Sequence, residues 1–120
     1  METASTPAPD AGPGEYVETV LDLVERVPRG RATTYGVIAE AARQVTGKGS
    51  ARTVGAVMAR YGAGVPWWRV VTASGAVADR VAGRGLELLQ AEGVPLTSHA
   101  PPRVDLAEAG WEPAEAGSQM

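Results

Sequence analysis

The chain has 120 residues, a formal net charge of −3, one histidine and no cysteine. This length suits one small domain with a modest core, and the lack of cysteine excludes disulfides, thiolate metal sites and cysteine nucleophiles. No apolar run approaches the roughly 18 to 20 residues that cross a bilayer, and no signal-peptide pattern opens the chain, so we expect a soluble cytoplasmic protein without membrane contact.

The N-terminal part predicts a tail followed by a helix. Residues 1–14 are rich in Pro, Ala and Gly and show no periodicity, so we expect a disordered tail there. From Tyr16 to Val27 apolar residues recur at three- and four-residue spacing, which predicts an amphipathic helix that ends before Pro28.

Two further helices are predicted, each with its own cap. Thr33 or Thr34 can cap a helix over 35–46, and Ser50 can cap another over 51–61. A glycine-containing turn joins them, which is the helix-turn-helix pattern of many DNA-binding domains. As a bare pattern it is also found in small helical domains that never touch DNA.

Two adjacent tryptophans, Trp67 and Trp68, follow the third helix. Pro66 precedes them and favours a stiff, extended backbone, and Arg69 follows them. Each indole carries a large apolar area that is costly to leave in water. The pair therefore predicts either a wedge in the core or a binding surface for a flat ligand, and both interpretations stay open.

The second half predicts a short hairpin and a fourth helix. Strands over 69–72 and 76–78 would flank a turn at 73–75, forming a wing beside the helices. A loop over 80–85 leads to a helix that carries Leu86, Leu88 and Leu89 and ends near Gly93.

The C-terminal part is rich in proline and predicts little regular structure. We expect the segment 103–106 to lie on the domain surface, the domain to extend over 15–111, and residues 112–120 to form a disordered tail.

Charge is segregated along the chain. Residues 1–27 carry a net charge of −5, residues 28–69 carry +6, and residues 70–120 carry −4. A basic middle between acidic ends fits contact with a phosphate backbone, but a solvated protein face would have the same composition.

Five groups of residues occur in one order along the chain. They are Pro28-x-Gly30-x-x-Thr33-Thr34-Tyr35-Gly36-x-Ile38-Ala39, Ala51-Arg52-x-Val54-Gly55-x-Val57-Met58, Pro66-Trp67-Trp68-Arg69-Val70-Val71 with Ser74-Gly75, Leu88-Leu89-x-x-Glu92-Gly93-Val94, and Arg103-Val104-Asp105-Leu106. Together they resemble the DNA-binding domain of the O6-alkylguanine-DNA alkyltransferases. The resemblance implies a mainly α-helical, winged-helix or helix-turn-helix DNA-binding domain with a short β-hairpin.

The alkyltransferases carry a Pro-Cys-His-Arg-Val motif whose cysteine accepts the alkyl group, and this chain has Trp67 at that position. An indole cannot replace an activated thiolate. The chain is therefore similar to the alkyltransferase-like proteins, which bind alkylated guanine without repairing it. They keep histidine after that tryptophan, whereas this chain has Trp68.

The resemblance implies a monomeric, non-enzymatic DNA damage sensor without catalytic residues, cofactor or metal. It would dock a helix-turn-helix in the minor groove of duplex DNA that contains O6-alkylguanine, and flip the damaged nucleotide into a tryptophan-lined pocket. The bound lesion would then be marked for nucleotide excision repair proteins.

The residues that would contact DNA by this resemblance lie at the two helix starts. Arg52 would fill the gap left by the flipped base, and Tyr35 would press on the phosphate of that nucleotide. An ordinary surface arginine and a half-buried core tyrosine are the plainer interpretations. The whole predicted set is Thr34, Tyr35, Ser50, Ala51, Arg52 and Gly55.

The lesion pocket would be formed mainly by residues after the third helix. Trp67 would contact the damaged base, and Arg80 would read it by a cation–π contact. Arg69 and Glu92 are expected to be structural. The whole predicted set is Tyr35, Trp67, Trp68, Ser74, Arg80 and Val81.

A winged-helix regulator that reads sequence in the major groove is the alternative function. The basic middle of the chain would suit it, but a regulator has no reason to place paired tryptophans behind the wing. An enzyme of another chemistry is poorly supported by a chain with one histidine and no cysteine.

Overall fold

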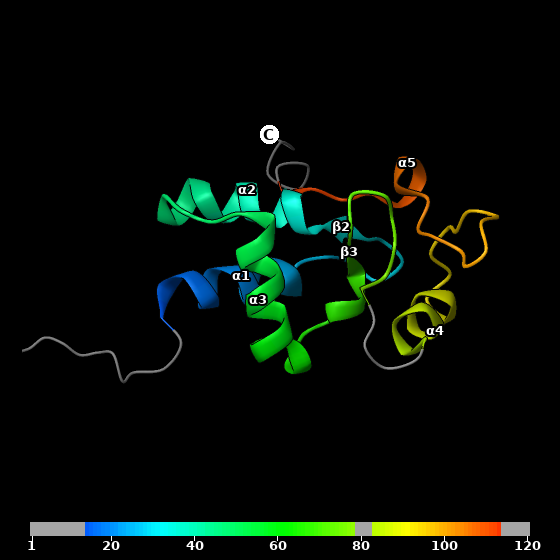
Figure 1. The fold of residues 1–120 in the computed structure, drawn as a ribbon, viewed down its shortest axis with the longest axis horizontal. Coiled ribbons are helices and arrows are strands. Elements are labelled where there is room, and N and C mark those ends of the chain that lie inside the picture. Colours follow the sequence, from blue (N-terminus) through cyan, green and yellow to red (C-terminus); the bar gives the residue numbers. More distant parts are fainter. Residues whose placement is uncertain (1–13, 79–82, 114–120) are drawn as a thin grey trace, which may run out of the picture.

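The computed structural model describes residues 14–78 and 83–113, which form a mainly helical fold with one small sheet (Figure 1). No helix in these two ranges is long and apolar enough to cross a membrane. The elements in chain order are α1 (Glu15–Glu25), β2 (Thr33–Thr34), α2 (Tyr35–Thr46), α3 (Ala51–Tyr61), the 3-10 turns Gly62–Gly64 and Trp67–Arg69, β3 (Val70–Val71), α4 (Arg84–Ala91) and α5 (Leu106–Ala109).

Local capping chemistry sets the starts of α2 and α3. The Thr34 hydroxyl accepts a hydrogen bond from the Val37 N–H at 3.1 Å, which satisfies one of the free amides in the first turn of α2. At α3, Ser50 and Thr53 form a reciprocal capping box. The predicted bounds of both helices and both caps are confirmed.

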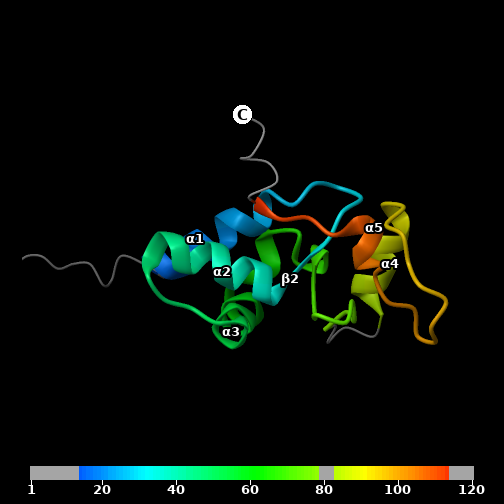
Figure 2. The same ribbon diagram turned by 90° about the horizontal axis from the view of Figure 1, so that it is seen from above.

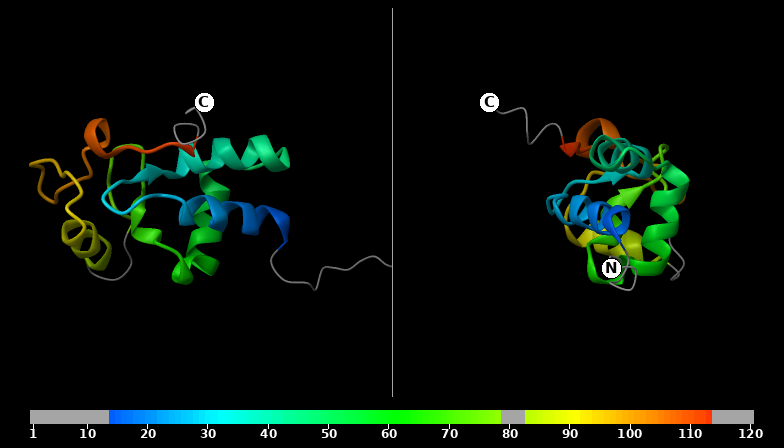
Figure 3. Two further views of the ribbon diagram at one scale, coloured as in Figure 1. Left: turned by 180° about the vertical axis from the view of Figure 1, so that it is seen from behind. Right: turned by 90° about the vertical axis from the view of Figure 1, so that its left-hand side faces the viewer.

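The first three helices form one body, in which α3 runs across α1 and α2 (Figures 1 and 3). Each helix buries an apolar stripe against the other two, as the helical spacing of their apolar residues predicts. The buried residues of this first core are Val20, Leu23, Val24, Ile38, Ala39, Ala42, Val54, Val57 and Val70.

A second, smaller core includes residues of β3, α4 and α5. Figure 2 shows α4 and α5 together on the side of the sheet away from the first three helices. Strands β2 and β3 pair in parallel, with Thr33 opposite Val70 and Thr34 opposite Val71. Because successive strand residues point to opposite faces, Val70 enters the first core and Val71 the second. The buried residues of the second core are Ala32, Val71, Leu89, Val94, Val104 and Ala109.

The predicted hairpin is wrong in its second strand. Within the described ranges β3 pairs with β2 alone, and the chain after it makes a tight turn. The Gly75 N–H donates to the Thr72 carbonyl at 2.8 Å, and the Thr72 N–H donates to the Ala76 carbonyl at 3.0 Å. The Gly75 carbonyl then accepts from the Val104 N–H at 2.9 Å, so the C-terminal segment takes the place of a returning strand.

Two other expectations need correction. The sequence predicts segment 103–106 on the surface, but Val104 is only 2% exposed because it packs in the second core and forms a bridge with Leu96. The loop expected over 80–85 ends earlier, since Arg84 already begins α4. Residues 79–82 lie outside the described residues.

Substitution of Gly75 tests the geometry of this turn. Its φ is +86°, and a Cβ there would lie 2.3 Å from the Val104 carbonyl oxygen. Gly75→Ala should therefore lower the free energy of unfolding by roughly 2 to 4 kcal/mol, from backbone strain and the displaced segment. Denaturant unfolding monitored by circular dichroism would measure it.

Gly64→Ala is the matched control, because a Cβ at Gly64 meets no atom within 4 Å and its φ is not in the left-handed region. It should change stability by less than about 0.5 kcal/mol. Equal stability of the two variants would contradict the close approach of Gly75 to Val104.

Candidate functional site

A cavity of about 750 Å³ lies between the starts of α2 and α3 and the turn that follows β3. Segments far apart in the sequence line it, because the β2–β3 pairing brings the start of α2 beside the chain that leaves β3. The lining residues are Thr34, Tyr35, Gly36, Ala51, Arg52, Gly55, Met58, Ala59, Gly62, Ala63, Trp67, Thr72, Ala73 and Ala78.

The cavity brings together most of the predicted DNA-contact residues and one predicted pocket tryptophan. Thr34 and Tyr35 enter it from the start of α2, Arg52 and Gly55 from α3, and Trp67 from the 3-10 turn before β3. Ala51 also lines it. Burial raises the pKa of the half-buried Tyr35 phenol, so its hydroxyl keeps its proton and stays a hydrogen-bond donor at neutral pH.

Small side chains and one cation characterise the cavity wall. Most lining residues are Gly or Ala, and a Cβ added at Gly55 would meet no atom within 4 Å. Among the described lining residues only Arg52 is charged, and its side chain is exposed. Helix α3 carries no acidic residue. The wall therefore offers close access, apolar surface and positive charge, which suit a nucleic acid.

Five predicted site residues lie elsewhere or outside the described residues, and Trp68, expected in the lesion pocket, is one of them. Ser50 caps α3 and does not line the cavity. Ser74 lies at the turn, where its hydroxyl is 3.1 Å from that of Thr72. Arg80 and Val81 fall in residues 79–82, which lie outside the described residues.

Several lining residues were not predicted. Met58 and Ala59 lie three and four residues after Gly55, so they share its face of α3. That helical spacing would have identified them. Thr72 and Ala73 carry no such signal, because their position depends on the turn stabilised by Gly75.

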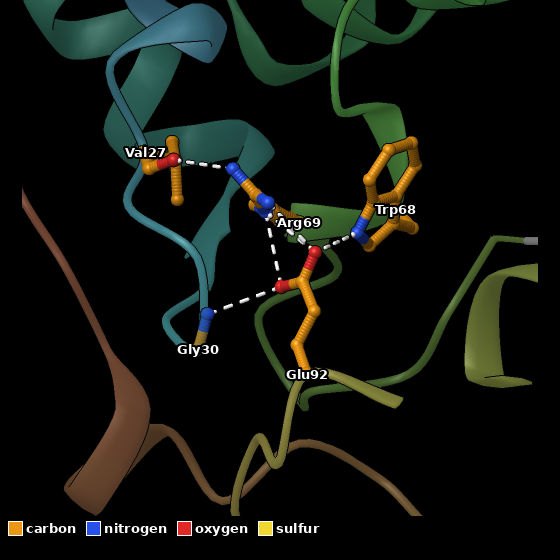
Figure 4. A network of polar contacts seen from close by, with 5 residues as sticks. All are labelled: Val27, Gly30, Trp68, Arg69 and Glu92. Atoms are coloured by element: carbon orange, nitrogen blue, oxygen red, sulfur yellow. Dashed lines mark hydrogen bonds and ion pairs between the residues drawn. The ribbon is translucent and has the colours of Figure 1, made fainter. Parts of the chain in front are cut away.

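Trp68 does not line the cavity. Its indole nitrogen points into a polar network around Glu92 (Figure 4). The Glu92 carboxylate accepts from the Trp68 Nε1–H at 2.8 Å, from Arg69 Nη2 at 2.7 Å and from the Gly30 N–H at 3.1 Å. Arg69 also donates to the Val27 carbonyl at 2.8 Å. The side chain of Glu92 is 4% exposed and that of Arg69 is 13% exposed.

The network lowers the pKa of Glu92. Burial alone would raise it, but hydrogen bonds from Arg69, Gly30 and Trp68, together with the Arg69 charge, outweigh the burial. The carboxylate is thus charged and fully used in structural bonds at neutral pH. The expected structural roles of Arg69 and Glu92 agree with these contacts.

Trp67 and Trp68 contact each other at right angles. Their ring centroids are 5.6 Å apart and the planes meet at 88°, which is a favoured edge-to-face geometry. The Arg69 guanidinium lies 5.5 Å from the Trp68 ring centroid. Trp67 therefore lines the cavity, and Trp68 connects Trp67 to the Glu92 network.

Known proteins with similar sequences belong to a family of DNA-binding domains. Residues 15–94 match the family model described as 6-O-methylguanine DNA methyltransferase, DNA binding domain. The chain is 34% identical to alkyltransferase-like protein 1 of Schizosaccharomyces pombe over 107 residues, which covers 82% of this chain and 96% of that protein.

Solved structures show the same similarity. The crystal structure of S. pombe Atl1 in complex with damaged DNA containing O6-carboxymethylguanine has a TM-score of 0.68 and 31% identity, covering 82% of this chain and 95% of the other. An OGT variant of Mycobacterium tuberculosis has a TM-score of 0.57 and 27% identity, covering 74% and 55% of the two chains.

Acid sensitivity tests the Glu92 network. Because its folded pKa is lowered, Glu92 stabilises the fold above the unfolded value of about 4.3 and loses that effect as the pH falls through the folded pKa. Glu92→Gln should lower the free energy of unfolding at neutral pH by about 3 kcal/mol. It should also reduce the loss of stability between about pH 5 and pH 3.

Glu87→Gln supplies the control for denaturant unfolding across this pH range. Glu87 forms an exposed pair with Arg84 at 3.7 Å, so its loss should change stability by less than about 1 kcal/mol. A Glu92→Gln variant with the stability and acid response of the wild type would contradict the role of the network.

Proposed function

Because the chain is an alkyltransferase-like member of the 6-O-methylguanine DNA methyltransferase family, we propose that it binds O6-alkylguanine in duplex DNA without removing the alkyl group. One observation carries the proposal. A single cavity joins the start of α2, the Arg52 face of α3 and the Trp67 indole, which are the parts needed to hold DNA and one extruded base.

We assign docking on the minor groove to α2 and α3, with α3 as the inserted helix. The exposed Arg52 and the bare backbone at Gly55 support this assignment, because they allow a close approach of positive charge to the duplex. Thr34 and Ser50 lie at helix starts, where free amides and the helix dipole attract phosphate groups. Their capping bonds are compatible with this second role.

Extrusion of the damaged nucleotide would cost a few kcal/mol. An alkyl group on O6 weakens the pair with cytosine, so the damaged base is the easier one to extrude. In the proposal Arg52 fills the gap in the duplex and Tyr35 presses on the backbone of the flipped nucleotide. Trp67 then contacts the base, and stacking on an aromatic ring is worth roughly 1 to 3 kcal/mol.

The roles of Arg80 and Val81 in the proposed pocket rest on the sequence resemblance alone. Arg80 would read the base face by a cation–π contact, with Val81 beside it. Ser74 lies one residue beyond the lining residue Ala73 and would contact the base from the turn. Trp68 contributes through Trp67 and Glu92 instead of through the cavity wall.

No alkyl transfer is expected, because the chain contains no cysteine and Trp67 stands where the resemblance implies an acceptor. A protein that holds an extruded lesion without repairing it leaves the damage in place. We propose that the bound complex marks the site for nucleotide excision repair proteins.

The proposal predicts selective binding. The affinity for a duplex with one O6-methylguanine should exceed the affinity for the unmodified duplex at least about tenfold, as one stacked base suggests. Arg52→Ala should weaken binding to both duplexes, whereas Trp67→Ala should chiefly reduce the preference for the lesion. Fluorescence anisotropy of labelled duplexes would measure both affinities.

Two controls accompany this titration. The mass of the protein should be unchanged after incubation with the methylated duplex, since no group is transferred. Equal affinity for the two duplexes would refute the proposal, and a lesion-independent preferred sequence would favour a regulator instead.

Gly55→Ala separates stability from binding. A Cβ at this mid-helix position meets nothing, so the variant should be as stable as the wild type or more stable by up to about 1 kcal/mol. The added methyl group nevertheless faces the cavity and should weaken DNA binding several-fold. Thermal unfolding and the same anisotropy titration measure the two effects, and unchanged affinity would place DNA elsewhere.

A further inference from the structure

Trp68 contacts both the tryptophan that lines the cavity and a buried carboxylate. Its ring meets Trp67 edge-to-face at 5.6 Å, and its Nε1–H donates to Glu92 at 2.8 Å. We propose that Trp68 is a positioning residue that fixes the Trp67 indole against the Glu92 network, so that the cavity wall is formed before DNA binds. Its effect on lesion recognition rests on the proposed function.

The Trp67 side chain depends on packing for its orientation, because it lacks polar restraints in the described part of the chain. Within residues 14–78 and 83–113 no polar group is hydrogen-bonded to its indole nitrogen, and the side chain is only partly buried. Pro66, with φ −73°, and the short 3-10 turn restrict its backbone, not its side-chain torsions. The perpendicular contact with Trp68 is an aromatic packing interaction that opposes rotation of this ring.

Trp68 is itself held firmly. The Glu92 carboxylate also bonds to Arg69 and to Gly30, so it cannot follow a moving indole without breaking other buried bonds. The Arg69 guanidinium lies 5.5 Å from the Trp68 ring centroid, and the indole packs against the second core. Figure 4 shows the contacts from Glu92 to Trp68. The edge-to-face contact of Trp68 with Trp67 continues them to the ring that lines the cavity.

A cavity wall that is ordered before DNA binds lowers the entropic cost of binding. Immobilising one flexible side chain on binding costs an amount that corresponds to roughly two- to tenfold in affinity. Without Trp68 this cost would fall on the complex in which Trp67 holds a base. It would be absent from binding to undamaged DNA that leaves the cavity empty.

Two substitutions test the inference. Trp68→Ala removes both contacts and should reduce the ratio of lesion to undamaged affinity about five- to tenfold. Trp68→Phe keeps an aromatic ring beside Trp67 but gives Glu92 no donor, and should reduce the ratio about two- to threefold. Affinity for the undamaged duplex should stay within about twofold of the wild type in both variants.

Leu96→Ala is the matched control for stability. Leu96 packs against the same second core but does not line the cavity. Its removal should lower the melting temperature while preserving the affinity ratio. A ratio that falls equally in Leu96→Ala would overturn the inference, because general destabilisation would then explain the result.

The free protein gives an independent readout through 19F NMR of 5-fluorotryptophan. The Trp67 signal, assigned from Trp67→Phe, should broaden and show a larger H2O–D2O isotope shift in Trp68→Phe, while the Trp111 signal stays unchanged. An unchanged Trp67 signal would overturn the inference, whatever the DNA result. If wild type shows no lesion preference, the proposed function fails, and this signal alone decides the positioning role.

Discussion

The buried Glu92 carboxylate joins three segments that are distant from one another in the sequence. Through Gly30, Arg69 and Trp68 it holds together the loop after α1, the turn before β3 and the end of α4. A carboxylate taken out of water is costly unless charged and polar partners replace the solvent. Loss of any one of these groups (Glu92, Gly30, Arg69 or Trp68) would therefore leave the others without buried partners. The position of the turn that carries Trp67 depends on this network.

Features set within a few residues could be predicted from the sequence. The Thr34 and Ser50 caps each bond to an amide three residues away, so the bounds of α2 and α3 follow from local chemistry. Arg52 and Gly55 came from family resemblance and their spacing on one helix. Both line the cavity because that spacing places them on the same face of α3.

Features set by distant contacts could not be predicted. Each strand has two residues, too few for a periodic pattern, and Thr33 pairs with Val70 across a long stretch of chain. The prediction of a second hairpin strand was wrong because Val104, which is distant in the sequence, bonds to Gly75. The two tryptophans left a choice between a core wedge and a ligand surface. In the structure each alternative applies to one residue: Trp67 lines the cavity and Trp68 packs against the second core.

The side-by-side placement of Val70 and Val71 has a consequence for the cooperativity of unfolding. Each valine belongs to a different core, and the two cores are joined at this ladder and through the bonds of Glu92 to Gly30 and Arg69. Two parts with separate cores can open as separate cooperative units in hydrogen exchange once the bonds between them break. The cavity spans this seam, with α2 and α3 on one side and Thr72 and Ala73 on the other. A ligand seated there would couple the two halves, so that occupancy would turn two unfolding units into one.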